Sequence, residues 1–393
     1  MAKYHSESHA QADAAHDEPA GLADPTDTKS NCGVGAVVDL DGGASHDVVA
    51  DGIELLCNLE HRGTTGAEEA TGDGAGIMIQ RPDRFFEAVV GDLPETYAVG
   101  SVFMPQDETV RDRLVDRFES TLADYDLEGF HWRDVPTDNS DLGQTALDSE
   151  PDVWQVFVTP SESMADDAFD RALFLARREL EAAAEEIDGA GRFYVCSLHR
   201  KTLVYKGLLK GEQLAGYYPD LEDERLQTTL TLVHARFSTN TLGAWHLAHP
   251  YRRIIHNGEI NTIRGNINWM RARENQLAHE DFGDDIETLK PVTEAGQSDT
   301  ASVDNAIELL MHSDRDLPHI LRMLIPEAHE NDDSMDPDRQ DFYDYHASLV
   351  EPWDGPALVA ATDGDKIAAV LDRNGLRPCR YDITEDNQLI AAS

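Results

Sequence analysis

Two short apolar runs, each followed by polar residues, constrain this chain more than any other feature. The first, LVHARFSTNT, occupies residues 232–241, and the second, HPYRRIIHNGEINTIRGN, occupies residues 249–266. Apolar runs rich in β-branched residues are typical of buried strands. Polar residues directly after such strands are typical of a site at the edge of a sheet, so we expect both runs to deliver chemistry to one sheet edge.

The polar residues offer complementary groups for a small charged substrate. Arg236 carries a planar, permanently charged guanidinium that can hold a carboxylate. The side chains at 238–240, Thr239 among them, add hydrogen-bonding groups. Asn257 and Gly258 form a workable pair of donors for an oxyanion, because glycine lets a substrate approach the backbone closely. These two runs contain no nucleophile.

Further motifs lie on either side of the two runs. Cys32 begins the short apolar strand of NCGVGAVVDL, and GQSDTASVDN places Asp299 at the start of an amphipathic segment. TGDGAG, at residues 71–76, contains the glycines of a dinucleotide-binding loop but precedes a strand rather than a helix, so it fails the context of that motif. We expect its glycines to permit tight packing or close backbone approach near a ligand.

Eight motifs together resemble the class II glutamine amidotransferase domain of glutamate synthase. CGVG, EHRG, TGDGAG, HARFSTNT, HNGEINTIRGN, SDT, EPWDGP and LDRNGLRP occur in the order and spacing of that family, from about residue 31 to the end of the chain. The resemblance implies an N-terminal-nucleophile hydrolase fold. This is an α+β, four-layer αββα sandwich of antiparallel sheets, which agrees with the helical runs and hairpins of the sequence.

The resemblance also implies the roles of the main site residues. The thiol of Cys32 would attack the side-chain amide of L-glutamine, once removal of the preceding residues has exposed its α-amino group as the base. Asn257 and Gly258 would stabilise the oxyanion. Arg236 would bind the α-carboxylate of glutamine and Asp299 its α-ammonium. From composition alone, a lone cysteine at the start of a strand is a small buried hydrophobe.

Other candidates have simpler alternatives. Arg62, in EHRG, would lie on a loop near the glutamine pocket, or it is part of a surface ion pair. His234 and His256 suggest a Cys–His pair, but we expect hydrogen-bonded structural roles because this family takes its base from the chain terminus. Asp299 is alternatively the N-cap of the following helix. The residues alone give Trp353 and the DRNGLRP segment only turn and scaffolding roles.

Charge limits the partners. The 393 residues include 76 acidic and 32 basic residues, for a formal net charge of -44. Such a charge repels nucleic acid phosphates and anionic membrane surfaces. The acids are dispersed rather than gathered in one tail, so we expect the solvated surface of a halophilic, cytoplasmic protein, in which salt screens the self-repulsion.

The chain divides into a leader, residues 1–31, and one domain, residues 32–393. The leader is polar and acidic with almost no large apolar side chains, so we expect a disordered propeptide. No apolar run is long enough to span a bilayer. The four cysteines are far apart and form no C-x-x-C pair, which argues against a metal centre, an iron–sulfur cluster or a disulfide framework.

The order of expected elements follows from apolar periodicity. We expect a strand from Cys32 to the turn at 41–43, further strands at 77–80, 98–104, 130–135, 153–158, 192–199 and 202–207, and helices at 48–59, 108–125, 164–187, 262–274, 301–312 and 317–324. We expect a loop at 136–151. The last stretch, with turns at TDGD, DRNG and TEDN, predicts one antiparallel meander.

The predicted function is the glutaminase part of glutamate synthase. Ammonia would pass to a synthase domain or subunit that aminates 2-oxoglutarate, and the FMN and iron–sulfur cluster would belong to that part, leaving this chain without cofactors. The alternatives are the amidotransferase part of a glucosamine phosphate, phosphoribosylamine or asparagine synthase, and a non-catalytic glutamine sensor. NTIRGNINWM and EPWDGPALV favour glutamate synthase.

Overall fold

The computed structural model describes residues 32–59, 68–236, 243–294 and 296–393. In this part of the chain, the named strands form three antiparallel sheets. The first contains, in spatial order, β12 (Arg380–Ile383), β13 (Gln388–Ala392), β1 (Gly33–Asp39), β8 (Leu230–Ala235), β2 (Ala75–Gln80) and β7 (Thr202–Gly207). The second contains β11 (Ile367–Leu371), β10 (Ala357–Thr362) and β9 (Ile254–Gly258). The third contains β4 (Leu127–Asp134), β5 (Asp152–Pro160), β3 (Ala98–Met104) and β6 (Tyr194–His199).

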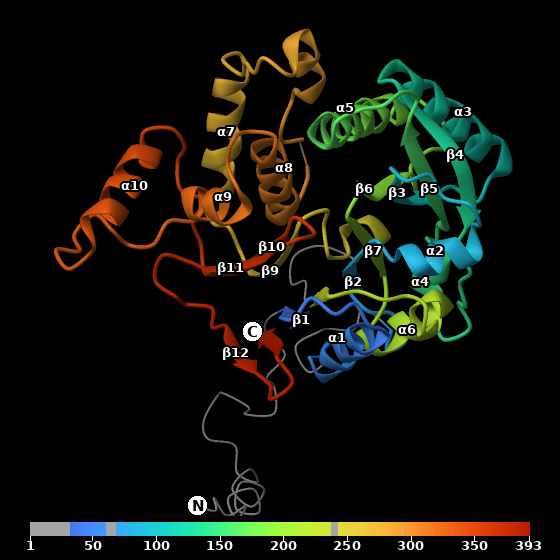
Figure 1. Cartoon of the computed structure of the whole chain (residues 1–393), viewed down its shortest axis with the longest axis horizontal. Coiled ribbons are helices and arrows are strands. Elements are labelled where there is room, and N and C mark those ends of the chain that lie inside the picture. Colours follow the sequence, from blue (N-terminus) through green and yellow to red (C-terminus); the bar gives the residue numbers. More distant parts are fainter. Residues whose placement is uncertain (1–31, 60–67, 237–242, 295) are drawn as a thin grey trace, which may run out of the picture.

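Helices cover the outer faces of these sheets. They are α1 (His46–Asn58), α2 (Asp83–Val89), α3 (Glu108–Asp124), α4 (Gln144–Asp148), α5 (Asp166–Ala184), α6 (Leu214–Tyr217), α7 (Ile263–Glu274), α8 (Asp299–Met311), α9 (Leu317–Leu324) and α10 (Pro337–Ala347). In Figure 1, α1 lies below β1, the sheet of β9, β10 and β11 lies above β1, and α8 and α9 lie above that sheet. This layering of antiparallel sheets between helices confirms the predicted fold class.

Glycines let α1 pack closely against the first sheet. A Cβ atom at Gly33 would lie 2.7 Å from Cβ of Leu59, and one at Gly35 would lie 2.6 Å from Cδ2 of Leu55. Both contacts are shorter than packed carbon atoms tolerate. The CGVG motif therefore brings α1 against the face of β1 that carries the odd-numbered residues.

The even-numbered side chains of β1 face the second sheet. Val34 and Ala36 are buried in one core cluster with Ile255 of β9 and Leu358 of β10. The opposite face of the second sheet, including Ile254, packs in a separate cluster with α8 and α9. Because neighbouring side chains of a strand point to opposite faces, the space between the two sheets receives alternate residues from β1, β8 and β9.

The prediction of one final meander is wrong. β10 pairs with β11 in the second sheet, whereas β12 pairs with β13 in the first. The DRNG turn therefore begins a crossing between two sheets. Its shape depends on the carboxylate of Asp372, which accepts hydrogen bonds from the backbone N–H groups of Asn374 and Leu376 at 3.0 Å each.

Three other sequence-based expectations differ from the structure. The polar runs do not end at one sheet edge, because β8 belongs to the first sheet and β9 to the second. The predicted loop at 136–151 contains the short helix α4, and α2, α6 and α10 were not predicted. A signal for α10 is present in the sequence, because Asp336 is its N-cap and Pro337 its first helical residue.

Candidate active site

Strand register places the predicted nucleophile beside the predicted carboxylate ligand. Gly33 of β1 lies opposite Ala235 of β8 in an antiparallel pair. The same register continued by one residue places Cys32 beside Arg236. On the other side of β8, the backbone N–H of Arg236 donates to the carbonyl oxygen of Gly74 at 2.8 Å. Three chain segments thus meet at this end of the first sheet.

Side-chain alternation indicates the direction of both groups. Cys32 is an even-numbered residue like Val34 and Ala36, so it lies on the same face of the strand, which is turned toward the second sheet. It packs against the core cluster to which those two residues belong. Arg236 has the same parity as His234, whose Nε2 donates to the carbonyl oxygen of His256 at 2.9 Å. That hydrogen bond joins the two sheets. Cys32 and Arg236 therefore belong to the strand faces turned toward the second sheet.

The end of β9 contributes the predicted oxyanion donors. Asn257 has the same parity as Ile255, which lies in the core between the sheets. Its side chain is 1% exposed, and neither Nδ2 nor Oδ1 has a hydrogen-bond partner among the described residues. A buried amide without partners costs free energy unless a ligand supplies them. This amide is thus a candidate binding group.

Gly258 requires glycine for two reasons. Its φ of +127° lies in a region that other residues rarely adopt, and an added Cβ would lie 1.8 Å from the carbonyl oxygen of Pro356. The chain therefore turns at the end of β9 in a way that only glycine permits. The turn brings the next residues toward α8.

Asp299 is the first residue of α8 and contacts this turn. Its Oδ2 accepts a hydrogen bond from the backbone N–H of Ile260 at 2.8 Å. The N-cap of α8 is Ser298, whose side chain accepts from the N–H of Ala301 at 3.1 Å, so the capping alternative for Asp299 is wrong. Asp299 is half-buried, hydrogen-bonded to a residue two positions after Gly258, and at a helix N-terminus, where a carboxylate is favoured. Sequence reasoning missed Ser298, although a serine before an amphipathic segment is a common N-cap signal.

The TGDGAG motif packs tightly beside Arg236, as predicted for its glycines. Nη1 of Arg236 donates to the carbonyl oxygen of Asp73 at 3.2 Å. A Cβ at Gly72 would lie 2.3 Å from the carbonyl oxygen of Leu209, and one at Gly76 would lie 2.5 Å from that of His249. The motif thereby supports Arg236 through its backbone.

The histidines near the site are neutral structural groups. Burial lowers the pKa of His234 to about 3. Burial also lowers the pKa of His256, whose Nδ1 lies 3.1 Å from Oγ1 of Thr300. Both rings are buried, and one nitrogen of each makes a contact that joins strands or strand and helix. Nδ1 of His234 and Nε2 of His256 have no hydrogen-bond partner among the described residues. The expectation that neither forms a catalytic pair with Cys32 stays a prediction.

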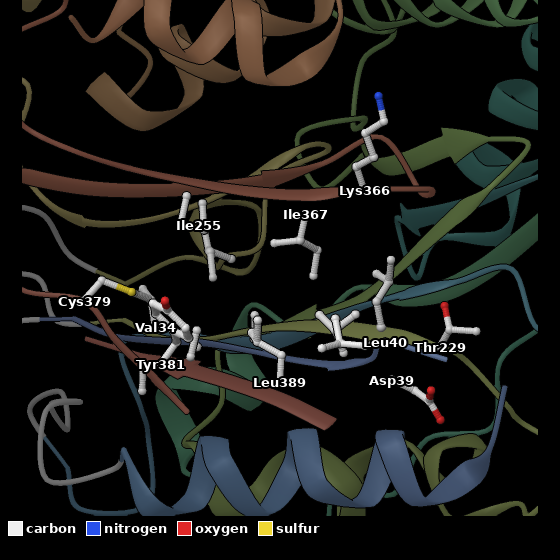
Figure 2. Close-up of a pocket in the computed structure, with 18 of the residues that line it drawn as sticks. Val34, Asp39, Leu40, Thr229, Ile255, Lys366, Ile367, Cys379, Tyr381 and Leu389 are labelled. Atoms are coloured by element: carbon white, nitrogen blue, oxygen red, sulfur yellow. The ribbon is translucent and has the colours of Figure 1, made fainter. Parts of the chain in front are cut away.

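An apolar cavity of about 620 Å³ lies farther along the space between the two sheets. Figure 2 shows Val34 and Leu389 on one side of it and Ile255 and Ile367 on the other, while the amine of Lys366 points away. Most of its lining is apolar, and its charged residues are Asp39, Asp365 and Lys366. The polar residues of the proposed site are therefore better candidates for glutamine recognition.

Two predicted ligands, Arg62 and Thr239, lie outside the described residues. Trp353 is buried, and Nε of Arg373 lies 3.2 Å from a carboxylate oxygen of Asp354, which fits scaffolding roles.

No disulfide joins the four cysteines, all of which are described. Within the described ranges, no group of three or more His, Cys, Asp or Glu side chains is placed to hold a metal ion. Across the same ranges, no helix has both the length and the apolar character needed to cross a membrane.

Comparison with known proteins assigns the family. Residues 32–393 match the class II glutamine amidotransferases. The chain belongs to this family. Membership confirms the prediction, made from the ordered motifs, of an amidotransferase domain, and it agrees with the observed layers of antiparallel sheets and helices.

Relatives of this amidotransferase are glutamate synthases. The glutamate synthase (NADPH) large chain of Bacillus subtilis is 43% identical over 380 residues, covering 95% of this chain and 25% of the relative. The glutamate synthase (NADH) of Saccharomyces cerevisiae is 43% identical over 390 residues, covering 95% of this chain and 18% of the relative. The ferredoxin-dependent glutamate synthase 2 of Arabidopsis thaliana is 39% identical over 381 residues, covering 95% and 23%. The chain thus spans a quarter or less of the length of these relatives.

Proposed function

We propose that this domain hydrolyses L-glutamine to glutamate and ammonia, and that the ammonia serves a glutamate synthase. The observation that carries the proposal is the buried amide of Asn257, which has no hydrogen-bond partner among the described residues and lies on the strand face turned toward the strand that follows Cys32. The identity to glutamate synthases of bacteria, yeast and plants favours this synthase over the other amidotransferase-dependent enzymes.

The proposed reaction begins with the thiol of Cys32. The sulfur attacks the side-chain amide carbon of glutamine and gives a tetrahedral oxyanion, which Asn257 and the backbone N–H of Gly258 stabilise. Collapse of this intermediate breaks the C–N bond, and the nitrogen leaves as ammonia after gaining a proton. Water then attacks the γ-glutamyl thioester, which releases glutamate and restores the thiol.

The proposed base is the α-amino group of Cys32 itself. An α-amino group has a pKa of roughly 7.7–8.0, so it can accept and return a proton near neutral pH. It exists only after residues 1–31 have been removed, because until then the nitrogen belongs to a peptide bond. The start of the family match at residue 32 supports this boundary. We therefore assign residues 1–31 as a propeptide.

Substrate recognition would rest on two opposite charges. Arg236 would bind the α-carboxylate and Asp299 the α-ammonium, which together select a free amino acid over a peptide. We retain Arg62 and Thr239 as further proposed ligands from the resemblance. The partner would be the synthase part, as a domain or a subunit. FMN and an iron–sulfur cluster would be bound there. For the cluster, the spread of the four cysteines over separate elements of this chain supports this assignment.

Asp299→Asn tests the recognition half of the proposal. The asparagine oxygen can still accept the N–H of Ile260, but the charge that pairs with the ammonium is lost. We expect the KM for glutamine to rise roughly 10- to 100-fold, because hydrogen bonds to charged groups contribute more than neutral ones. Steady-state ammonia release measures this change. Asp316→Asn, at the N-cap of α9, is the matched control and should keep the KM of the wild type; an unchanged KM in Asp299→Asn would contradict the assignment.

We also propose that the protein works in a salty cytoplasm. The net charge of -44 supports this, because like charges destabilise the compact state unless salt screens them. The urea midpoint of unfolding should therefore rise from dilute buffer to molar KCl. Sucrose, which leaves charges unscreened, controls for general exclusion effects. Equal midpoints in dilute buffer and in KCl would refute the halophilic assignment.

A further inference from the structure

Buried aromatic rings connect the two halves of the proposed glutamine site. The ring of His234, which donates to the backbone of His256, stacks on the ring of His249 with centroids 4.2 Å apart and planes 14° apart. His249 in turn packs against Tyr251 with centroids 4.5 Å apart at 72°. This series of rings begins next to Arg236 and Asn257 and ends at Tyr251.

The series continues into the start of α8. The hydroxyl of Tyr251 lies 2.9 Å from Oγ of Ser298, the N-cap residue that directly precedes Asp299. Asp299 then contacts the backbone N–H of Ile260, two residues after Gly258. The contacts therefore form a closed loop that joins the proposed oxyanion donors on β9 to the proposed ammonium ligand on α8.

Tyr251 and His249 are buried rings whose protonation does not change across the physiological pH range. Tyr251 is 2% exposed, and burial raises the pKa of its hydroxyl to about 12. Burial lowers the pKa of His249 well below its usual value. Both rings are thus neutral, and neither ring nitrogen of His249 has a hydrogen-bond partner among the described residues. His249 is therefore linked to α8 only by its packing against Tyr251 and by the contact of the Tyr251 hydroxyl with Ser298, among the described residues.

We propose that Tyr251 is a positioning residue that fixes Asp299 through Ser298 and thereby sets the preference for ligands with an α-ammonium group. The inference rests on the proposed glutaminase function and deepens it. The hydroxyl of Tyr251 holds Ser298, the N-cap of α8, so its loss lets the first turn of the helix shift. Asp299 moves with that turn, whereas Arg236, directly after β8, stays in place.

Competitive inhibition of glutamine hydrolysis separates these two ligands. L-glutamate presents both a carboxylate and an ammonium, while glutarate has the same two carboxylates without the ammonium. In Tyr251→Phe the inhibition constant of L-glutamate should rise roughly three- to tenfold, the range expected for one lost hydrogen bond. The inhibition constant of glutarate should stay within about twofold of the wild-type value. The ratio of the two constants is the decisive readout, because general loosening of the fold would weaken both inhibitors.

Matched variants keep the test specific. Tyr343→Phe removes another buried hydroxyl, which donates to Glu327 at 3.0 Å on a different part of the molecule, and should leave the ratio unchanged. Ser298→Ala removes the same bond from its other end, and combining it with Tyr251→Phe should change the ratio by less than the product of the single effects.

The outcomes distinguish this inference from the function on which it rests. Active Tyr251→Phe protein with an unchanged ratio, or with both constants raised equally, overturns the positioning role and leaves the glutaminase intact. A mature wild-type protein that releases no ammonia from glutamine overturns the proposed function, and the positioning role with it.

Discussion

Cys32→Ala is expected to abolish glutamine hydrolysis, with a loss of at least about a thousandfold, while the protein remains folded. No other group in the proposed reaction can form the thioester, so the covalent route is lost completely. The change removes only one sulfur atom from a half-buried side chain at the edge of the core. Ammonia release and thermal unfolding of the same preparation measure the two effects.

Cys379→Ala is the matched control for this experiment. Cys379 is also half-buried and packs against the same core, but it precedes β12 in the region of the apolar cavity. This variant should keep the activity of the wild type. Hydrolysis that survives in Cys32→Ala would refute the nucleophile assignment, and glutamine binding without hydrolysis in the mature wild type would favour a sensing module.

The intact mass of the protein shows whether the chain begins at Cys32. The amine base requires a chain that begins at this residue, so active preparations should contain that species by intact-mass spectrometry. Protein that retains residues 1–31 should be inactive. Full activity in such protein would show that another group removes the proton from the thiol.

Asn257→Ala should separate activity from stability. Removing one oxyanion donor typically raises the barrier by about 2.7–4 kcal/mol, so kcat should fall roughly 10²- to 10³-fold. Stability should stay level or increase, because the buried amide has no hydrogen-bond partner among the described residues and its removal relieves a desolvation cost. Ammonia release and urea unfolding of the same variant test both halves of the prediction.

Asn266→Ala provides the opposite pattern. The amide of this buried asparagine donates to the carbonyl oxygen of Pro352 at 2.9 Å and accepts from Oγ1 of Thr262 at 2.7 Å. Its loss should cost about 1–3 kcal/mol of stability and leave kcat unchanged. If Asn257→Ala destabilises the protein as much as Asn266→Ala does, Asn257 is a structural residue rather than an oxyanion donor.

Local sequence patterns predicted most elements that carry the site. The apolar periodicity before Gly258 gave β9, and that after Asp299 gave α8, because each pattern depends on residues close in the chain. The same reasoning failed for the final strands. A turn such as DRNG looks alike in sequence whether the chain returns to its own sheet or crosses to another, and only long-range pairing decides.

The sequence by itself determined the family, the amidotransferase chemistry to be tested and the residue types that would perform it. Tertiary structure decided that β8 and β9 belong to different sheets, that Ser298 rather than Asp299 caps α8, and that Tyr251 reaches this cap. The physical reason is range. The periodicity of a strand or helix depends on residues that are close in the chain, and the chemistry of a residue depends on its type alone. Register, burial and the partners of a side chain depend on segments that are distant in the chain.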